Sequence, residues 1–169
     1  MPRSFDLAVD YEGTVEQVHR ALRDRSYWLE RLADSGADHA TLDSMAVDDH
    51  GGIDVVTTQV LRRNRLPGVV TQFHAGDLSI VREETWSPIS DGRSTATVTG
   101  AITGAPVSLS GNAVLGPGAA VGSRLALTAA VEVRIPLVGG KVENFIGNQL
   151  VELLIAEQRF TTAWLAENQ

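Results

Sequence analysis

The sequence contains no cysteine, which excludes disulfide bonds, thiolate nucleophiles and cysteine-ligated zinc or iron–sulfur sites. It also lacks any run approaching the roughly 20 apolar residues that a transmembrane helix requires. The first six residues, MPRSFD, contain no apolar segment of the kind found in secretory signals. We therefore expect a cytoplasmic protein without a transmembrane segment.

Basic residues are also few. The sequence has 14 Lys and Arg and 21 Asp and Glu, which give a formal net charge of -7. Nucleic acids and anionic lipid surfaces are bound by clustered basic residues, so we expect neither as a partner. The one basic cluster, Arg62, Arg63 and Arg65, lies beside a predicted turn. We interpret it as a solvated rim.

Signatures of metal and cofactor binding are missing as well. His19, His39, His50 and His74 form no pair at metal-ligand spacing, and no His-Glu-x-x-His motif occurs. The glycines at 116–118 and 139–140 lack the sequence context of a phosphate-binding loop. We expect the protein to work without a metal or a cofactor.

The composition that remains, 43% hydrophobic and 21% charged, is typical of a globular protein, and 169 residues fit a single domain, 1–169. Residues 4–11 alternate between apolar and polar and predict a strand. Thr14 and Gln17 form a capping box that predicts a short helix. Ser26 is expected to cap a second one, in which Trp28 and Leu32 share a face.

Turn signals rich in glycine and proline then separate runs rich in threonine and valine. The short spacing favours antiparallel hairpins over helical crossovers. Six further strands are predicted, over 38–48, 53–63, 77–86, 94–103, 107–115 and 122–135.

A long helix is predicted over residues 141–168, with one broad apolar stripe that must cross the sheet. Gln149 falls near the centre of this stripe, and Glu157 falls towards its edge. Since a buried polar group without a partner is unfavourable, each is either a satisfied rim residue or part of a cavity wall.

The strand over 77–86 places a charged pair, Arg82 and Glu84, on the same face as apolar residues. The pair faces the interior if the alternation is regular, and it faces solvent if a bulge shifts the register. Small residues on the neighbouring strands leave room for a pocket or for a close approach of the helix. These are Ala96, Gly100, Gly111 and Ala113.

Residues 65–76 interrupt the strands with a Pro-Gly turn and three apolar residues, Val69, Val70 and Phe73. Long connections in compact domains often carry function. This segment is therefore either an ordinary covering loop or a lid.

The order of these elements resembles the START-like, Bet v 1-like helix-grip superfamily, also called SRPBCC. Ser26-Tyr27-Trp28 and the segment 135–143, IPLVGGKVE, are similar to an uncharacterised actinobacterial branch of it. The resemblance implies an α+β fold in which a curved seven-stranded antiparallel sheet grips the long helix around a cavity. In relatives this cavity binds lipids, sterols or polyketides, and some relatives are cyclases or dehydratases.

Three functions follow as hypotheses. The first is binding or transport of a small hydrophobic or amphiphilic ligand, such as a lipid, a sterol or a polyketide-like molecule. The second is a cavity enzyme of the cyclase or dehydratase type that uses Arg82, Glu84 or His74. The third is an interaction module that uses Val151 and Ile155, which leaves a homodimer open. The expected ligand-binding residues are Phe73, Ile80, Arg82, Glu84, Trp86, Val98, Leu109, Leu127, Val131, Phe145, Gln149, Leu153 and Glu157.

Overall fold

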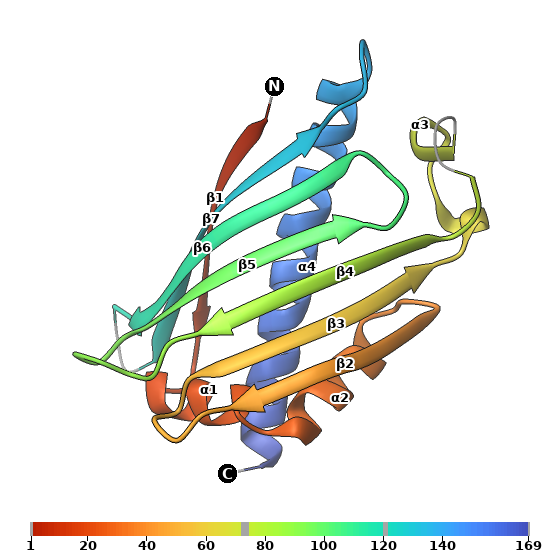
Figure 1. Cartoon of the computed structure of the whole chain (residues 1–169). Helices are drawn as coiled ribbons and strands as arrows, with labels where there is room; N and C mark the ends of the chain where they lie inside the picture. The colour runs from red at the N-terminus through yellow and green to blue at the C-terminus, as the bar shows by residue number, and fades with distance from the viewer. Residues whose placement is uncertain (1, 72–74, 120–121, 169) are drawn as a thin grey trace.

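A computed structural model describes residues 2–71, 75–119 and 122–168 of the chain. Seven antiparallel strands form one sheet, and the long helix α4 lies against one of its faces (Figure 1). The predicted α+β helix-grip fold, with two short helices after the first strand, is therefore confirmed. The strands are β1 (Arg3–Tyr11), β2 (His39–Val47), β3 (Ile53–Leu61), β4 (Leu78–Trp86), β5 (Ser94–Ile102), β6 (Val107–Pro117) and β7 (Ser123–Val133). The helices are α1 (Val15–Leu22), α2 (Arg25–Asp34), η1 (Arg63–Arg65, a 3₁₀ turn), α3 (Gly68–Thr71) and α4 (Gly139–Glu167).

The first and last strands of the chain pair with each other, so the strand order is β1-β7-β6-β5-β4-β3-β2. This order makes β1 and β2 the two edges of the sheet. Helices α1 and α2 carry the chain from one edge to the other and lie at one end of the sheet, beside the C-terminal part of α4 (Figure 1). Helix α2 contacts both β2 and α4, and it thereby closes this end of the interior.

The starts of the two short helices follow from local hydrogen bonding. The side chain of Thr14 accepts from the amide of Gln17, whose side chain accepts from the amide of Thr14, so the predicted capping box is confirmed. The predicted cap of α2 is wrong. Asp24 caps this helix by accepting a hydrogen bond from the amide of Ser26, which belongs to the first turn.

Helix α4 begins at Gly139, and its buried face is not the predicted one. Gln149 is exposed, so the expectation that it lies near the centre of the buried face is wrong. The reason is a close contact at Gly147, where an added Cβ would lie 2.1 Å from the ring of Phe5 on β1. This contact turns the helix so that its buried residues are Gly139, Val142, Glu143, Gly147, Leu154, Thr161, Trp164 and Leu165.

The connection between β3 and β4 contains η1 and α3. Arg65 pairs with Asp38 at 3.2 Å and donates a hydrogen bond to the carbonyl of Gly36, so it ties this connection to the segment between α2 and β2. Phe73 and His74 lie outside the described residues. A lid role for residues 65–76 stays a prediction.

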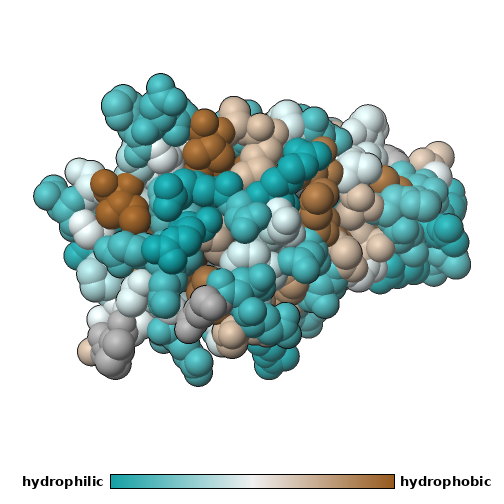
Figure 2. Space-filling model, turned by 90° about the horizontal axis from the view of Figure 1, so that it is seen from below, coloured by the Kyte–Doolittle hydropathy of each residue, from teal (hydrophilic) through white to brown (hydrophobic). Residues whose placement is uncertain are grey.

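Large apolar side chains on the surface come from several separate elements. On the face shown in Figure 2, most of the surface is hydrophilic, and the hydrophobic residues lie in small separate groups. Within the described parts of the chain, no helix is both long and apolar enough to cross a membrane. The exposed large apolar residues are Leu29, Val47, Val114, Leu137, Val151 and Ile155.

Candidate functional site

The charged pair of β4 faces the interior. β4 pairs with β3 and β5 without a shift in register, so the alternation of its side chains is regular. Arg82 lies opposite Gly100, and Glu84 lies opposite Val98, both on the face that α4 covers. The two interpretations left open by the sequence are thereby decided in favour of the interior.

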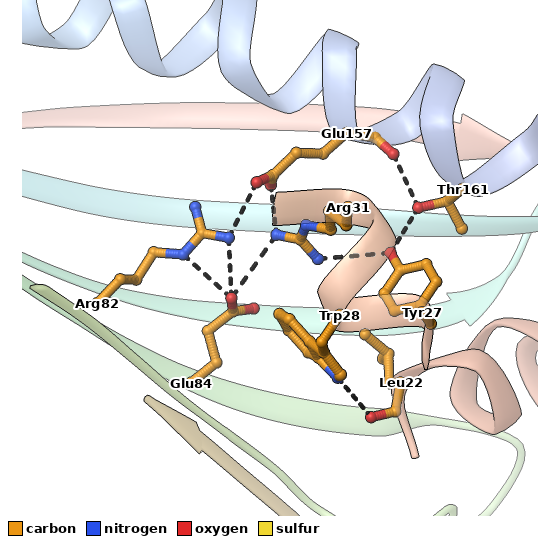
Figure 3. A network of polar contacts seen from close by, with 8 residues as sticks. All are labelled: Leu22, Tyr27, Trp28, Arg31, Arg82, Glu84, Glu157 and Thr161. Carbon is orange, nitrogen blue, oxygen red and sulfur yellow. Dashed lines mark hydrogen bonds and ion pairs between the residues drawn. The ribbon is translucent and has the colours of Figure 1, made fainter. Parts of the chain in front are cut away.

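Two further ionisable residues complete a cluster with this pair. We call Arg31 of α2, Arg82 and Glu84 of β4, and Glu157 of α4 the charged tetrad; their side chains are only 8% to 16% exposed (Figure 3). Glu157 binds Nη2 of Arg31 at 2.7 Å and Nη2 of Arg82 at 2.9 Å. Glu84 binds Nε of Arg82 at 3.1 Å and its Nη2 at 2.9 Å, and it lies 3.7 Å from Nη2 of Arg31. Each positive group therefore faces both negative groups.

A chain of hydrogen bonds extends from the charged tetrad to the backbone of α4 (Figure 3). The hydroxyl of Thr161 donates to the carbonyl of Glu157 at 2.7 Å, so it accepts from the hydroxyl of Tyr27 at 2.6 Å. The Tyr27 oxygen in turn lies 3.4 Å from Nη1 of Arg31, which donates to it. This chain fixes α2 against α4.

The indole ring of Trp28 packs against the guanidinium group of Arg31. The ring lies under the guanidinium, with 4.7 Å between the ring centroid and Cζ, and it meets the ring of Tyr27 edge-on. Nε1 of Trp28 donates to the carbonyl of Leu22 at 2.8 Å, which anchors the indole to the end of α1. The buried cation therefore has an aromatic face beside it as well as two carboxylates.

The charges of the tetrad stabilise one another against the effect of burial. Burial by itself would raise the pKa of Glu157, but Arg31 and Arg82 outweigh this effect and hold its pKa below the ordinary value of 4.5. Burial would likewise lower the pKa of Arg82, but Glu157 and Glu84 raise it. The two arginines thus hold Glu157 in its ionised form, and the four charges of the tetrad balance.

The lowered pKa of Glu157 predicts a loss of stability in acid. Because the folded protein binds this proton more weakly than the unfolded chain, the stabilisation is complete above about pH 4.5 and is lost as the pH falls through the folded-state pKa. Urea unfolding from neutral pH down to about pH 3 should show a steeper decline for the wild type than for Glu157→Gln. The exposed Glu152→Gln variant is the control and should follow the wild type. Equal slopes for the wild type and Glu157→Gln would contradict this prediction.

A small cavity of about 80 Å³ lies between the sheet and α4, next to the charged tetrad. Gly111 and Ala113 of β6 and Ala129 of β7 leave this space open, and leucines from several elements form much of the remaining wall. A second cavity of about 40 Å³ adjoins α2 and β3, and Arg31, Arg82 and Glu157 line both cavities. The charged tetrad therefore separates the two spaces.

Most of the predicted ligand-binding residues line the larger cavity. Three others do not line it: Val131 is fully buried in a second cluster with Val107 and Val142, and Ile80 and Phe145 are half-buried. Gln149 faces out for the reason given above. The predicted residues on the wall are Arg82, Glu84, Trp86, Val98, Leu109, Leu127, Leu153 and Glu157.

Sequence reasoning missed Arg31, Tyr27 and Tyr11. Tyr27 and Arg31 are four residues apart, so they lie on one face of α2, and this spacing could have drawn attention to them. Tyr11 ends the strand predicted over residues 4–11, and nothing in that alternation indicates that it lines the cavity.

Neither the outer face of the sheet nor the acidic and histidine side chains among the described residues provide a second candidate site. A depression of about 670 Å³ on the outer face of the sheet is open to solvent, and both polar residues such as Asp54 and Thr97 and apolar residues such as Pro88 and Val114 line it. Among the described residues, no group of three or more His, Asp or Glu side chains could hold a metal ion.

Comparison with known sequences relates nearly the whole chain to one family. Residues 6–165 match the family described as "Protein of unknown function (DUF2505)". A relative from Mycobacterium tuberculosis strain H37Rv, Uncharacterized protein Rv0481c, is 53% identical over 173 residues, and the alignment covers 99% of each chain. Since mycobacteria are actinobacteria, the predicted actinobacterial branch is confirmed.

Solved structures of other proteins share the fold of this chain. The aromatase/cyclase Zhui from Streptomyces sp. R1128 has a TM-score of 0.65 at 10% identity, covering 98% of this chain and 94% of that chain. Norcoclaurine synthase from Thalictrum flavum has a TM-score of 0.58 at 10% identity, covering 99% of this chain and 88% of that chain. The chain thus shares the helix-grip fold of these two proteins.

Proposed function

We propose that this chain, which belongs to the DUF2505 family, binds a small hydrophobic or amphiphilic ligand in the cavity between the sheet and α4. The observation that carries the proposal is unfilled volume in the middle of the interior. Protein interiors are normally packed to the density of organic crystals, so a space bordered by glycine and alanine calls for a reason. A bound apolar molecule supplies one.

The charged tetrad supports binding over catalysis. A cavity enzyme needs an acid or a base whose pKa lies near neutrality. Arg82 and Glu84 reach the cavity, as the enzyme hypothesis requires, but both are already paired with ions of opposite charge. His74, the third residue of that hypothesis, lies outside the described residues. The aromatase/cyclase and norcoclaurine synthase share the fold with this chain at only 10% identity, and their activities are not transferred to it.

The volume of the cavity limits the ligand. About 80 Å³ holds a few water molecules or one very small molecule, whereas ligand sites usually measure roughly 300–1,000 Å³. A lipid or a sterol therefore requires the cavity to enlarge. Movement of α2 would separate Arg31 from Glu84 and Glu157 and would join the two cavities, so α2 is the element that we propose moves.

The experiment combines extraction with a fluorescent probe. Native mass spectrometry and organic extraction should detect an apolar compound in the purified protein, and N-phenyl-1-naphthylamine, an uncharged probe, should become fluorescent on binding to the protein freed of that compound. Ala113→Leu fills the cavity and should weaken binding of the probe about tenfold. Ala126→Leu, on the exposed face of the neighbouring strand, should leave probe binding unchanged. A protein that yields no extractable compound and does not bind the probe would overturn the proposal.

A further inference from the structure

The charged tetrad has no net charge. Arg31 and Arg82 supply two positive charges, Glu84 and Glu157 supply two negative charges, and every cation lies within 4 Å of both anions. Among the described residues that line the cavity, these four are the only Lys, Arg, His, Asp or Glu side chains. No charge in the wall is therefore left over to attract an ion.

A charged head group would be a fifth ion in this site. A carboxylate beside Arg82 would also approach Glu84 and Glu157, and the set would then carry a net negative charge in a largely dry interior. An uncompensated buried charge is strongly unfavourable, even where some N–H groups can still donate to it. The remaining donors of the guanidinium groups suit a neutral oxygen instead.

Tyr11 is one polar group of the wall that has no hydrogen-bond partner among the described residues. It ends β1, it is 8% exposed, and it lines the cavity. Its hydroxyl forms no hydrogen bond with any described residue, whereas the hydroxyl of Tyr27 is bonded to Thr161 and Arg31. Burial, together with the nearby hydroxyl of Tyr27, raises the pKa of Tyr11, so the phenol keeps its proton and is available as a donor.

A second donor on this wall is also unused. The indole of Trp86 lines the cavity, and its Nε1 is buried without a hydrogen-bond partner among the described residues. Leaving such a group unpaired is unfavourable. Both unpaired groups are donors in their neutral forms, so an acceptor on the ligand would complement them.

We propose that the ligand of this cavity is an uncharged, largely apolar molecule with a carbonyl or hydroxyl oxygen that accepts a hydrogen bond from Tyr11. The inference rests on the proposed function and narrows it, because it selects neutral ligands over charged amphiphiles. The apolar part lies against Leu109, Leu125, Leu127 and Leu154, which form the wall beyond the charged tetrad.

Three probes of equal chain length test this inference by displacing N-phenyl-1-naphthylamine from the wild-type protein: 2-octanone, octanoate and octane. At neutral pH the ketone should bind at least about tenfold more tightly than octanoate, because only octanoate brings a charge. Tyr11→Phe should weaken the binding of 2-octanone about fivefold. It should weaken the binding of octane less than about twofold, because octane accepts no hydrogen bond.

The outcomes separate this inference from the proposed function. If neither N-phenyl-1-naphthylamine nor any of the three compounds binds, the cavity does not hold ligands and the proposed function fails. If octanoate binds as tightly as 2-octanone, or if Tyr11→Phe weakens the ketone and octane equally, the proposed function stands and the inference about neutral ligands is wrong. The comparison of the compounds on the wild type needs no variant, so a folding defect of Tyr11→Phe would not prevent the test.

Discussion

Arg31→Met should lower the free energy of unfolding by about 3–5 kcal/mol. The substitution keeps most of the side chain's volume but leaves Glu84 and Glu157 with Arg82 as their only cation in a buried site. It also removes the donor to Tyr27 and the group that lies over Trp28. Urea unfolding at neutral pH measures the change, and Arg159→Met, an exposed arginine of α4, should change stability by less than about 0.5 kcal/mol.

A double variant separates charge balance from packing at this position. Arg31→Met/Glu157→Gln removes one charge of each sign and leaves Arg82 paired with Glu84. We expect the double variant to lose less unfolding free energy than the sum of the two single losses, by about 1 kcal/mol or more. A loss below about 1 kcal/mol for Arg31→Met, or strict additivity in the double variant, would show that the charged tetrad is not energetically coupled.

Trp28→Ala should destabilise the protein by a similar amount, about 3–5 kcal/mol. Trp28 is 1% exposed, and its removal leaves a large cavity between α1, α2 and the sheet. The variant also loses the hydrogen bond to the carbonyl of Leu22 and the edge-on contact with Tyr27. Thermal and urea unfolding measure the loss.

The neighbouring residue provides the control for this prediction. Leu29 is 46% exposed on the same helix, so Leu29→Ala should cost less than about 1 kcal/mol. Trp28→Phe should fall between the two, because it keeps an aromatic ring in the core but loses the indole donor and part of the buried volume. A Trp28→Ala variant as stable as Leu29→Ala would mean that α2 is not packed as described.

Local patterns were enough to predict most of the secondary structure. The alternation along residues 4–11 and 77–86 identified strands correctly, since side chains of a strand point to opposite faces with a period of two. The capping box of Thr14 and Gln17 predicted the start of α1 correctly, because both of its hydrogen bonds join residues only three positions apart. Strand ends shifted by one or two residues, because ladder partners and not side-chain patterns decide where pairing stops.

Local patterns also singled out three members of the charged tetrad, Arg82, Glu84 and Glu157, but they did not predict how these residues pair, and they missed Arg31. Glu157 of α4 lies 75 residues from Arg82 in the chain, and Arg31 lies on an element that the sequence assigned only to the core. Pairing between such residues depends on how α2 and α4 approach β4. No spacing within either helix encodes it.

Residue periodicity and turn chemistry are sufficient to predict the order of the elements, the one apolar face of the sheet and the presence of a long helix across it. The buried side of α4 depends instead on packing between distant elements, since Gly147 lies against Phe5 of β1, with Gln149 outside and Glu157 inside. The polar groups of the cavity also balance in charge. That balance depends on distances between three separate elements, which periodicity cannot supply.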